Sequence, residues 1–235
     1  MGSMYIRETI SSHTPSLLLY GPKGCGKTQL VRAIATHLNA IIIDLSPFTI
    51  QGIYEGEKNG HLRLLYSAFK VAREFQPAIV YIDECDQIFS GAKKGKKGKK
   101  KKAKKGEGGS AARMKKDLVT YKKLLKPKDR VLIIGCTSKP YDASLADLRT
   151  FFKVKIWISH PNYATRKELW EHYIEEAGVE INPNKFHFSV LAQISEGYTA
   201  GAIVETIKKV LTERRKANLK RRALDIKEFI GPLSR

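Results

Sequence analysis

Short apolar runs alternate with amphipathic stretches along the chain as far as Pro161. The apolar runs have the length and the Ile, Val and Leu content of buried strands, and they cover residues 17–20, 41–45, 77–84, 131–135 and 154–158. Between them, apolar residues recur at helical spacing over 28–38, 61–74 and 115–125. Strands that alternate with helices predict an α/β fold, in which parallel βαβ units form one sheet with helices on both faces.

The pattern changes after Pro161. Strand-like runs nearly stop there, and helical periodicity follows over 165–177, 190–194, 200–217 and 226–230. We therefore expect a large α/β domain over 17–160 and a smaller α-helical lid domain over 161–235. Residues 1–16 are expected to be a lead segment, whose first four residues, Met-Gly-Ser-Met, look like the remnant of an expression tag.

A lysine-rich tract interrupts the α/β part of the sequence. Residues 93–105 contain ten lysines and no acid, and they account for half of the net charge of +20. The wider segment 91–113 cannot bury enough apolar surface to offset the entropy lost on ordering, which predicts a disordered insertion. A second basic stretch covers residues 208–222.

This positive charge favours anionic partners, namely nucleic acid, acidic protein tails or a membrane surface. No aromatic residues for base stacking lie between the lysines of 93–105, which makes nucleic acid the weaker candidate. Acidic tubulin tails would suit this tract, and a solvated tract without any partner is the alternative.

Several features favour a cytoplasmic protein. No apolar run reaches the roughly 18 residues that a membrane span needs, and no signal peptide precedes the first predicted strand. The three cysteines form no CxxC pair, as expected for a protein of a reduced compartment.

Residues 21–28, with the sequence GPKGCGKT, fit the P-loop pattern GxxxxGK[ST] between a predicted strand and a predicted helix. The glycines let backbone N–H groups point at phosphate oxygens, Lys27 would reach the β- and γ-phosphates of ATP, and the Thr28 hydroxyl would ligate Mg²⁺. A glycine-rich turn that matches by chance is the alternative, and the strand before it and the helix after it argue against chance. The predicted nucleotide-binding residues here are Gly21, Pro22, Lys23, Gly24, Cys25, Gly26, Lys27, Thr28 and Gln29.

A strand that ends in Asp83 and Glu84 adds the acids that a nucleotide hydrolase needs. The carboxyl ends of parallel strands meet at one edge of the sheet, so Asp83 is expected beside the P-loop, where it can hold Mg²⁺ through water. Glu84 would then orient and deprotonate the attacking water. Two acids after an apolar strand are commonly a solvated edge, but the P-loop upstream favours the functional interpretation.

The order of these motifs resembles that of the AAA ATPase family. After the P-loop and the Asp-Glu strand come Thr-Ser-Lys-Pro at 137–140, behind another strand, and Gly-Tyr-Thr-Ala-Gly-Ala at 197–202 in the helical part. Residues 129–140, 161–166 and 211–215 resemble IQ-motif-and-AAA-domain proteins in particular, and the lysine-rich insertion fits the same group. Those proteins are associated with the nexin–dynein regulatory complex of motile cilia. The resemblance, which covers nearly the whole chain, implies ATP and Mg²⁺ as cofactors, a homo-oligomer or an assembly with axonemal proteins, and an axonemal location.

The resemblance also implies roles for single residues that depart from the family pattern. The family's first sensor is usually an Asn, and Ser138 takes its place here with a shorter reach and one donor. The family commonly offers two arginines to the γ-phosphate of a neighbouring subunit, but here Phe151 stands in the second place and Arg149 remains. Turnover would then be slow. A surface cation without a catalytic role is the alternative for Arg149.

Two further positions have roles implied by the family. Gly201 and Ala202 would let the lid backbone approach the adenine, or they are simply small residues that pack at the start of a helix. Tyr54 falls where relatives that translocate a polypeptide place a pore-loop aromatic residue, or it packs on its own helix.

Three functions remain open on the sequence. An active ATPase that drives a mechanical or remodelling step is favoured by Lys27, Thr28, Asp83 and Glu84 together. A scaffold that binds nucleotide and barely hydrolyses it is favoured by Ser138 and by the missing second arginine. A nucleic-acid-associated ring ATPase is favoured by the charge. We favour a mixture of the first two: ATP binding with slow, assembly-dependent hydrolysis in a ciliary scaffold.

Overall fold

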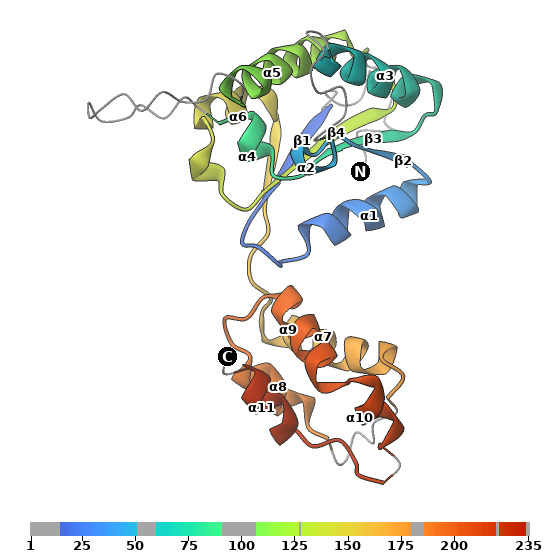
Figure 1. The fold of residues 1–235 in the computed structure, drawn as a ribbon, viewed down its shortest axis with the longest axis vertical. Coiled ribbons are helices and arrows are strands. Elements are labelled where there is room, and N and C mark those ends of the chain that lie inside the picture. Colours follow the sequence, from blue (N-terminus) through green and yellow to red (C-terminus); the bar gives the residue numbers. More distant parts are fainter. Residues whose placement is uncertain are drawn as a thin grey trace, which may run out of the picture. The chain divides into compact units, whose positions relative to one another are not determined.

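The computed structural model describes residues 15–50, 60–90, 107–126, 128–179, 186–219 and 221–233, with the backbone alone over 107–113. The chain divides into two compact units. The first consists of Met1–Gly21 and Lys27–Trp157, and the second of Pro22–Gly26 and Ile158–Arg235. Figure 1 shows a sheet with helices in the first unit and helices in the second.

Five parallel strands form the sheet of the first unit (Figure 1). Their order is β2-β3-β4-β1-β5, and every neighbouring pair is parallel, which confirms the predicted α/β class. The two strands β3 and β4 are buried along their whole length, and this burial explains why their sequences are apolar without alternation. The strands are β1 (Ser16–Tyr20), β2 (Ile41–Asp44), β3 (Ala78–Ile82), β4 (Val131–Thr137) and β5 (Val154–Trp157).

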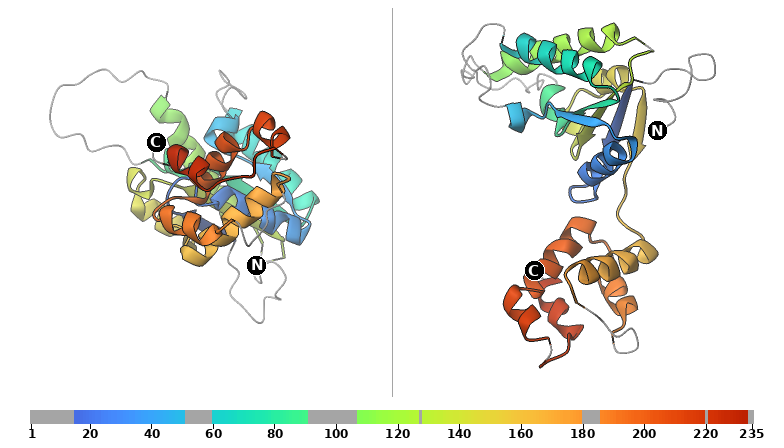
Figure 2. Two further views of the ribbon diagram at one scale, coloured as in Figure 1. Left: turned by 90° about the horizontal axis from the view of Figure 1, so that it is seen from below. Right: turned by 90° about the vertical axis from the view of Figure 1, so that its right-hand side faces the viewer.

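Helices cover both faces of this sheet, as Figures 1 and 2 show. On one face lies α1 (Lys27–Leu38), whose buried residues Val31, Ile34, Ala35 and Leu38 recur at helical spacing. On the other face, α3 (Gly60–Glu74) packs against α5 (Glu107–Leu124). The short elements of this unit are α2 (Pro47–Ile50), α4 (Cys85–Ile88), the 3₁₀ turn η2 (Pro140–Asp142) and α6 (Leu145–Phe151).

A close approach in the core depends on a glycine in β4. A Cβ atom at Gly135 would lie 2.4 Å from Cζ of Phe152, well inside van der Waals contact. Phe152 belongs to a cluster with Phe89 and Phe151, whose ring centroids lie 4.8–5.8 Å apart. The ring therefore packs directly on the strand backbone, and only glycine leaves room for it.

The second unit is a helical cluster with its own core. Trp170 and Phe229 meet edge to face, with ring centroids 5.4 Å apart, and both are fully buried. The Trp170 indole N–H donates to the Ser195 hydroxyl at 3.1 Å, which satisfies the one polar group of the ring. The helices are α7 (Tyr163–Glu176), α8 (Phe188–Ile194), α9 (Ala200–Val210), α10 (Glu213–Ala217) and α11 (Lys227–Leu233).

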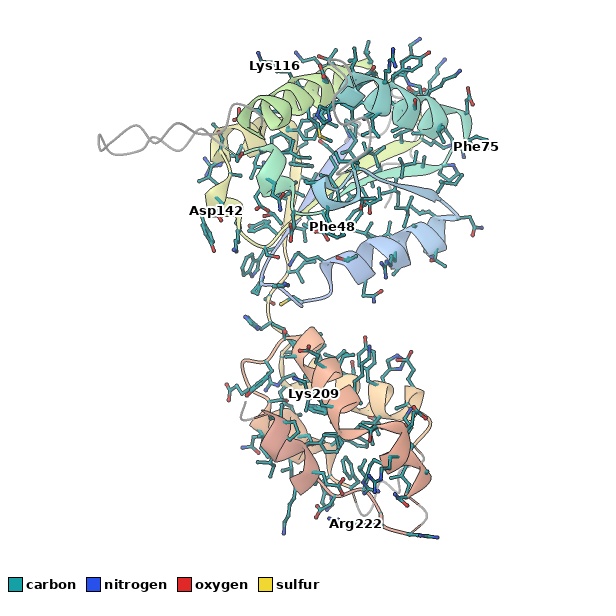
Figure 3. All side chains as sticks on the ribbon, viewed as in Figure 1. Phe48, Phe75, Lys116, Asp142, Lys209 and Arg222 are labelled. Atoms are coloured by element: carbon teal, nitrogen blue, oxygen red, sulfur yellow. The ribbon has the colours of Figure 1, made fainter. Side chains whose placement is uncertain are left out.

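Side chains of the second basic stretch lie on the surface of this unit. Lys209 and Arg222 are both exposed (Figure 3). Arg215 is half-buried, and its guanidinium makes a two-pronged ion pair with Glu228, at 2.8 and 2.9 Å. This pair fixes the segment that leads into α11.

Two helices differ from their predicted extent. The backbone of α5 is helical from Glu107 onward, inside the segment that the sequence pattern predicts to be disordered. Burial of Met114 and Leu118 against the core stabilises the helix, and this long-range packing is not visible in the local composition. The predicted helix over 200–217 is interrupted after Val210, because Leu211 is buried and Thr212 is extended, with φ −68° and ψ 157°.

Candidate functional site

The P-loop connects β1 to α1 at the carboxyl edge of the sheet. Its first residue, Gly21, donates its N–H to the Thr137 carbonyl at 3.3 Å, so the loop begins where β4 ends. Lys27, the first residue of α1, is only 7% exposed, and its ammonium donates to the Gly21 carbonyl at 2.9 Å. The ammonium is thereby held at Gly21, the first residue of the loop, and its contacts with phosphate stay a prediction.

Two of the three glycines of the loop adopt a backbone that other residues rarely tolerate. Gly24 has φ 84° and Gly26 has φ 86°, both in the left-handed region. Gly24 belongs to the second unit, where its carbonyl accepts from the Gly201 N–H at 2.8 Å and an added Cβ would lie 2.8 Å from Thr199 Oγ1. The hydroxyl of Thr199 also accepts from the Ala202 N–H at 3.3 Å, as the N-cap of α9. The predicted residues Gly24, Gly201 and Ala202 thus lie together within that unit.

The two predicted ligands of Mg²⁺ meet in the first unit. The Thr28 hydroxyl points to Asp83 Oδ2, at an oxygen–oxygen distance of 3.5 Å, although the two residues are 55 positions apart. A hydroxyl and a carboxylate are the hard oxygen donors that Mg²⁺ prefers, and the ion completes its coordination with water and phosphate oxygens. These residues therefore fit the ion that the P-loop pattern implies.

Tyr81 is a member of this site that the sequence pattern does not single out. Its phenol hydroxyl donates to Thr28 Oγ1 at 3.2 Å. Burial raises the pKa of the Tyr81 phenol above its usual value, so the group remains a hydrogen-bond donor. Side chains alternate along a strand, so residues 81 and 83 lie on the same face. This alternation is the sequence feature that could have indicated Tyr81 as a site residue.

The end of β2 contributes a second group of residues that the sequence pattern does not reveal. Ser46 is buried, and its Oγ accepts the backbone N–H of Asp83 at 2.8 Å. The Ser46 N–H donates to Asp44 Oδ1 at 2.9 Å, and the Ser46 hydroxyl donates to the same oxygen. Thr49 donates to the other carboxylate oxygen of Asp44 at 3.0 Å.

Glu84, the predicted general base, has an unusual backbone conformation. With φ 44° and ψ 43° it lies in the left-handed region, which costs a residue with a side chain of the order of 1 kcal/mol. Its N–H donates to Asp83 Oδ1 at 2.9 Å, and its exposed carboxylate accepts from the Gln87 amide. The turn separates the two acids, so that Asp83 is held inward while Glu84 is presented to solvent.

A cavity of about 340 Å³ opens beside these residues. Phe48, which is 87% exposed and labelled in Figure 3, stands at its wall. The cavity gives solvent or a ligand direct access to the carboxylates of the site. Its lining residues are Thr28, Arg32, Asp44, Ser46, Pro47, Phe48, Thr49, Tyr81, Asp83 and Glu84.

The predicted sensor and arginine positions lie in the same unit. Ser138 follows β4 and is half-buried, next to Thr137, whose hydroxyl donates to Asp86 Oδ1 at 2.6 Å. Arg149 is exposed on α6. Phe151, at the predicted place of the family's second arginine, is 3% exposed and packs in the phenylalanine cluster. An arginine at this position would therefore have to leave the core.

The sequence matches the family described as "ATPase family associated with various cellular activities (AAA)" over residues 17–160. The chain belongs to the AAA family. Among curated proteins, this AAA chain is 38% identical over 235 residues to Dynein regulatory complex protein 11 of Mus musculus, covering 98% of the chain and 26% of that protein. It is 32% identical over 194 residues to spastin of Xenopus tropicalis, covering 82% of the chain and 29% of that protein. The chain thus spans about a quarter to a third of the length of these relatives.

Solved structures show the same AAA fold. The crystal structure of the FIGL-1 AAA domain matches with a TM-score of 0.73 at 19% identity, covering 97% of this chain and 74% of that one. The FIGL-1 AAA domain in complex with ADP matches with a TM-score of 0.69 at 20% identity, covering 94% of this chain and 71% of that one.

Two of the three cysteines of the AAA chain are buried at strand ends. Burial raises the pKa of the Cys85 thiol, and it raises the pKa of Cys136 to about 12. Both groups therefore stay protonated, which is unlike the exposed, low-pKa thiols that respond to oxidants. Cys25 of the P-loop is half-buried.

Some predicted features fall outside the part of the AAA chain that the structure describes. These are Tyr54 and the lysine tract 93–105. Within the described ranges, no helix has the length and apolar character needed to span a membrane. In the same ranges, no group of three or more His, Cys, Asp or Glu side chains is arranged to hold a metal ion.

Proposed function

We propose that this chain binds ATP with Mg²⁺ and hydrolyses it slowly, within an assembly that completes its site. The meeting of Thr28 and Asp83, with oxygens 3.5 Å apart, carries the proposal. Both residues lie at the carboxyl edge of the sheet, and Lys27 is buried within the loop that joins β1 to α1. In this arrangement Lys27 and the loop amides would hold the phosphates, while Thr28 and Asp83 would hold the ion. Glu84, exposed beside them, would activate the attacking water.

The rate is proposed to be slow because two stabilising groups are weakened. Ser138 would replace an amide side chain with a single hydroxyl donor. Phe151 is a core residue, so Arg149 would be the one arginine of this region to act on a neighbouring subunit's nucleotide. An arginine contributed by a neighbour can raise the rate by roughly a thousandfold or more, which makes turnover depend on assembly.

The cellular setting is proposed from the similarity to Dynein regulatory complex protein 11 of the mouse. The name of that protein assigns it to a regulatory complex of dynein. By this similarity the module would belong to an axonemal scaffold of the cilium or flagellum, with axonemal proteins or further copies of itself as partners. Because the chain spans 26% of that protein, the proposal concerns one module of such a scaffold.

A ring ATPase that remodels a protein or acts on nucleic acid is the second candidate. It would use the same nucleotide site, and the positive charge of the chain favours it. Fast turnover by a ring would favour this candidate over the scaffold.

ATP turnover measured against protein concentration tests the proposal. We expect the rate per subunit to be low in dilute solution and to rise with concentration, because Arg149 would act between subunits. Glu84→Gln should lower turnover by about tenfold or more while ATP binding persists, since the amide cannot accept the proton from water. Glu74→Gln, which changes an exposed acid on α3, is the matched control and should turn over like the wild type.

Each outcome of this test separates the candidates. Turnover that is independent of concentration would contradict the role of neighbouring subunits. Turnover that persists in Glu84→Gln would contradict the proposed base. ATP binding without turnover at any concentration would leave a nucleotide-dependent scaffold.

We also propose that the lysine tract 93–105 binds acidic tubulin tails. Charge-driven binding should fall steeply between low and physiological salt, because each contact releases counterions. Co-sedimentation with microtubules should be lost when the ten lysines are changed to glutamine and kept when they are changed to arginine. Sedimentation that is the same for both variants would contradict this role.

A further inference from the structure

One link between β2 and β3 at the carboxyl edge is made by a side chain rather than by the backbone. The Leu45 N–H donates to the Tyr81 carbonyl at 2.8 Å, as in a parallel ladder. In a regular ladder the next donor, the N–H of Asp83, would bond to the Leu45 carbonyl, just past the end of β2. Instead it donates to Ser46 Oγ at 2.8 Å. Ser46 is 5% exposed, so water has little access to this bond.

Asp44 determines how the Ser46 hydroxyl points. Both the N–H and the hydroxyl of Ser46 donate to Asp44 Oδ1. Because the hydroxyl proton is directed at Asp44, a lone pair of Ser46 Oγ is left to accept the Asp83 N–H. Thr49 of α2 holds the second oxygen of Asp44 at 3.0 Å, which keeps the carboxylate from rotating away.

The carboxylate of Asp83 is sensitive to the position of its own backbone. Asp83 follows the last residue of β3, so the ladder does not hold its N–H in the usual way. Oδ1 accepts from the Glu84 N–H at 2.9 Å, and Oδ2 faces the Thr28 hydroxyl at 3.5 Å. Both contacts require the backbone of Asp83 to stay where Ser46 holds it.

We propose that Ser46, oriented by Asp44, is a positioning residue for Asp83 and thereby sets the affinity of the site for Mg²⁺. This inference rests on the proposed function, because it concerns the ion of that site. Ser46 acts through the backbone of Asp83 and does not contact the ion. Asp44 acts through Ser46, by the geometry of its oxygens rather than by its charge.

The test compares ADP affinity in excess Mg²⁺ with ADP affinity in EDTA, using the full chain. The ratio of the two affinities reports on the ion site, and the affinity in EDTA reports on the P-loop. Ser46→Ala should lower the ratio by roughly fivefold, the worth of about one hydrogen bond. Its affinity in EDTA should stay within about twofold of the wild type, because the phosphate contacts are untouched.

Three further variants separate positioning from fold and from charge. Ser46→Thr keeps the hydroxyl and should restore the ratio. Asp44→Asn keeps an oxygen that can accept both bonds from Ser46 but removes the charge, and it should also keep the ratio. Asp44→Ala removes the oxygens and should lower the ratio as Ser46→Ala does. If Ser46→Ala does not fold, the comparison of Asp44→Asn with Asp44→Ala carries the test.

Several results would overturn the inference. One is an unchanged affinity ratio in Ser46→Ala and Asp44→Ala. Another is an equal loss of ADP affinity in Mg²⁺ and in EDTA, which would indicate a purely structural role. A ratio in Asp44→Asn as low as in Asp44→Ala would assign the effect to charge and would also overturn it. If the wild type binds no ADP, the proposed function fails as well. If the wild type binds ADP and the affinity ratio is the same in all variants, only the positioning role is refuted.

Discussion

Lys27→Ala is expected to weaken the binding of ADP and ATP by about a hundredfold, the loss of roughly two charge-assisted hydrogen bonds. Lys27 is 7% exposed, and its ammonium donates to the Gly21 carbonyl at 2.9 Å. The Lys27 side chain is therefore already largely desolvated and held at Gly21 before any phosphate arrives. Binding of nucleotide would bring charged phosphate oxygens to this ammonium, and alanine removes these contacts altogether.

Lys23→Ala is the matched control for this prediction. Lys23 lies in the same loop and carries the same charge, but its side chain is exposed. Its replacement keeps the backbone N–H groups and should leave affinity within about threefold, the effect of an exposed charge. Isothermal titration with ADP measures both variants, and circular dichroism checks that both are folded. Equal losses in the two variants would assign the effect to net charge and would contradict a specific role for Lys27.

The elements that the sequence predicted well are those whose signal is local. The strands β3 and β4 are buried on both faces, so each shows as an unbroken apolar run. The P-loop is read directly from the order of its glycines with Lys27 and Thr28, because a tight turn around phosphate needs those residues at adjacent positions. Sequence order alone therefore predicted the parallel α/β class, whereas the strand order β2-β3-β4-β1-β5 comes from the structure and the nucleotide contacts of the loop stay a prediction.

The residues that the sequence did not reveal act across long separations. Tyr81 donates to Thr28 over 53 positions, and Ser46 accepts from Asp83 over 37. Neither belongs to a recurring local pattern, and a strand tyrosine or a serine after a strand is most often simple packing or a turn. Short helices such as α2 and α4 were missed for a different reason, because four residues are too few to show a period.

Phe151 shows how burial changes the meaning of a departure from the family pattern. From the sequence, it is a missing arginine and thus a catalytic loss. In the structure it is a core residue between Phe89 and Phe152, and its carbonyl accepts from the Ser16 hydroxyl at 2.8 Å. Phe151 therefore contributes to the core at the position where the family resemblance implies a catalytic arginine.

The same phenylalanine cluster makes Gly135 a tightly packed position of the sheet. Gly135→Ala is expected to destabilise the first unit by about 2–3 kcal/mol, the usual cost of overpacking a tight core. The added Cβ would lie 2.4 Å from Cζ and 2.9 Å from Cε1 of Phe152. Phe152 is fully buried and has Phe89 and Phe151 against it, so its ring cannot move aside.

Thermal unfolding followed by circular dichroism measures this effect. A loss of about 2–3 kcal/mol corresponds to a fall in Tm of roughly 5–10 °C for a unit of this size. Gly231→Ala in α11 is the matched control, because a Cβ there would meet nothing within 4 Å. Alanine is favoured over glycine in a helix by up to about 1 kcal/mol, but Pro232 disfavours a helical residue with a Cβ before it, so this variant should change stability less than Gly135→Ala does.

A second substitution tests whether the ring of Phe152 is the cause. Phe152→Leu alone should destabilise the first unit, because it leaves a cavity between Phe89 and Phe151. In the double variant the alanine methyl group and the shortened side chain share the space, so the combined loss should be smaller than the sum of the single losses. A coupling of about 1 kcal/mol or more is expected for residues in direct contact. Strict additivity would mean that the cost of Gly135→Ala arises in the strand itself, and it would contradict the close approach of Phe152.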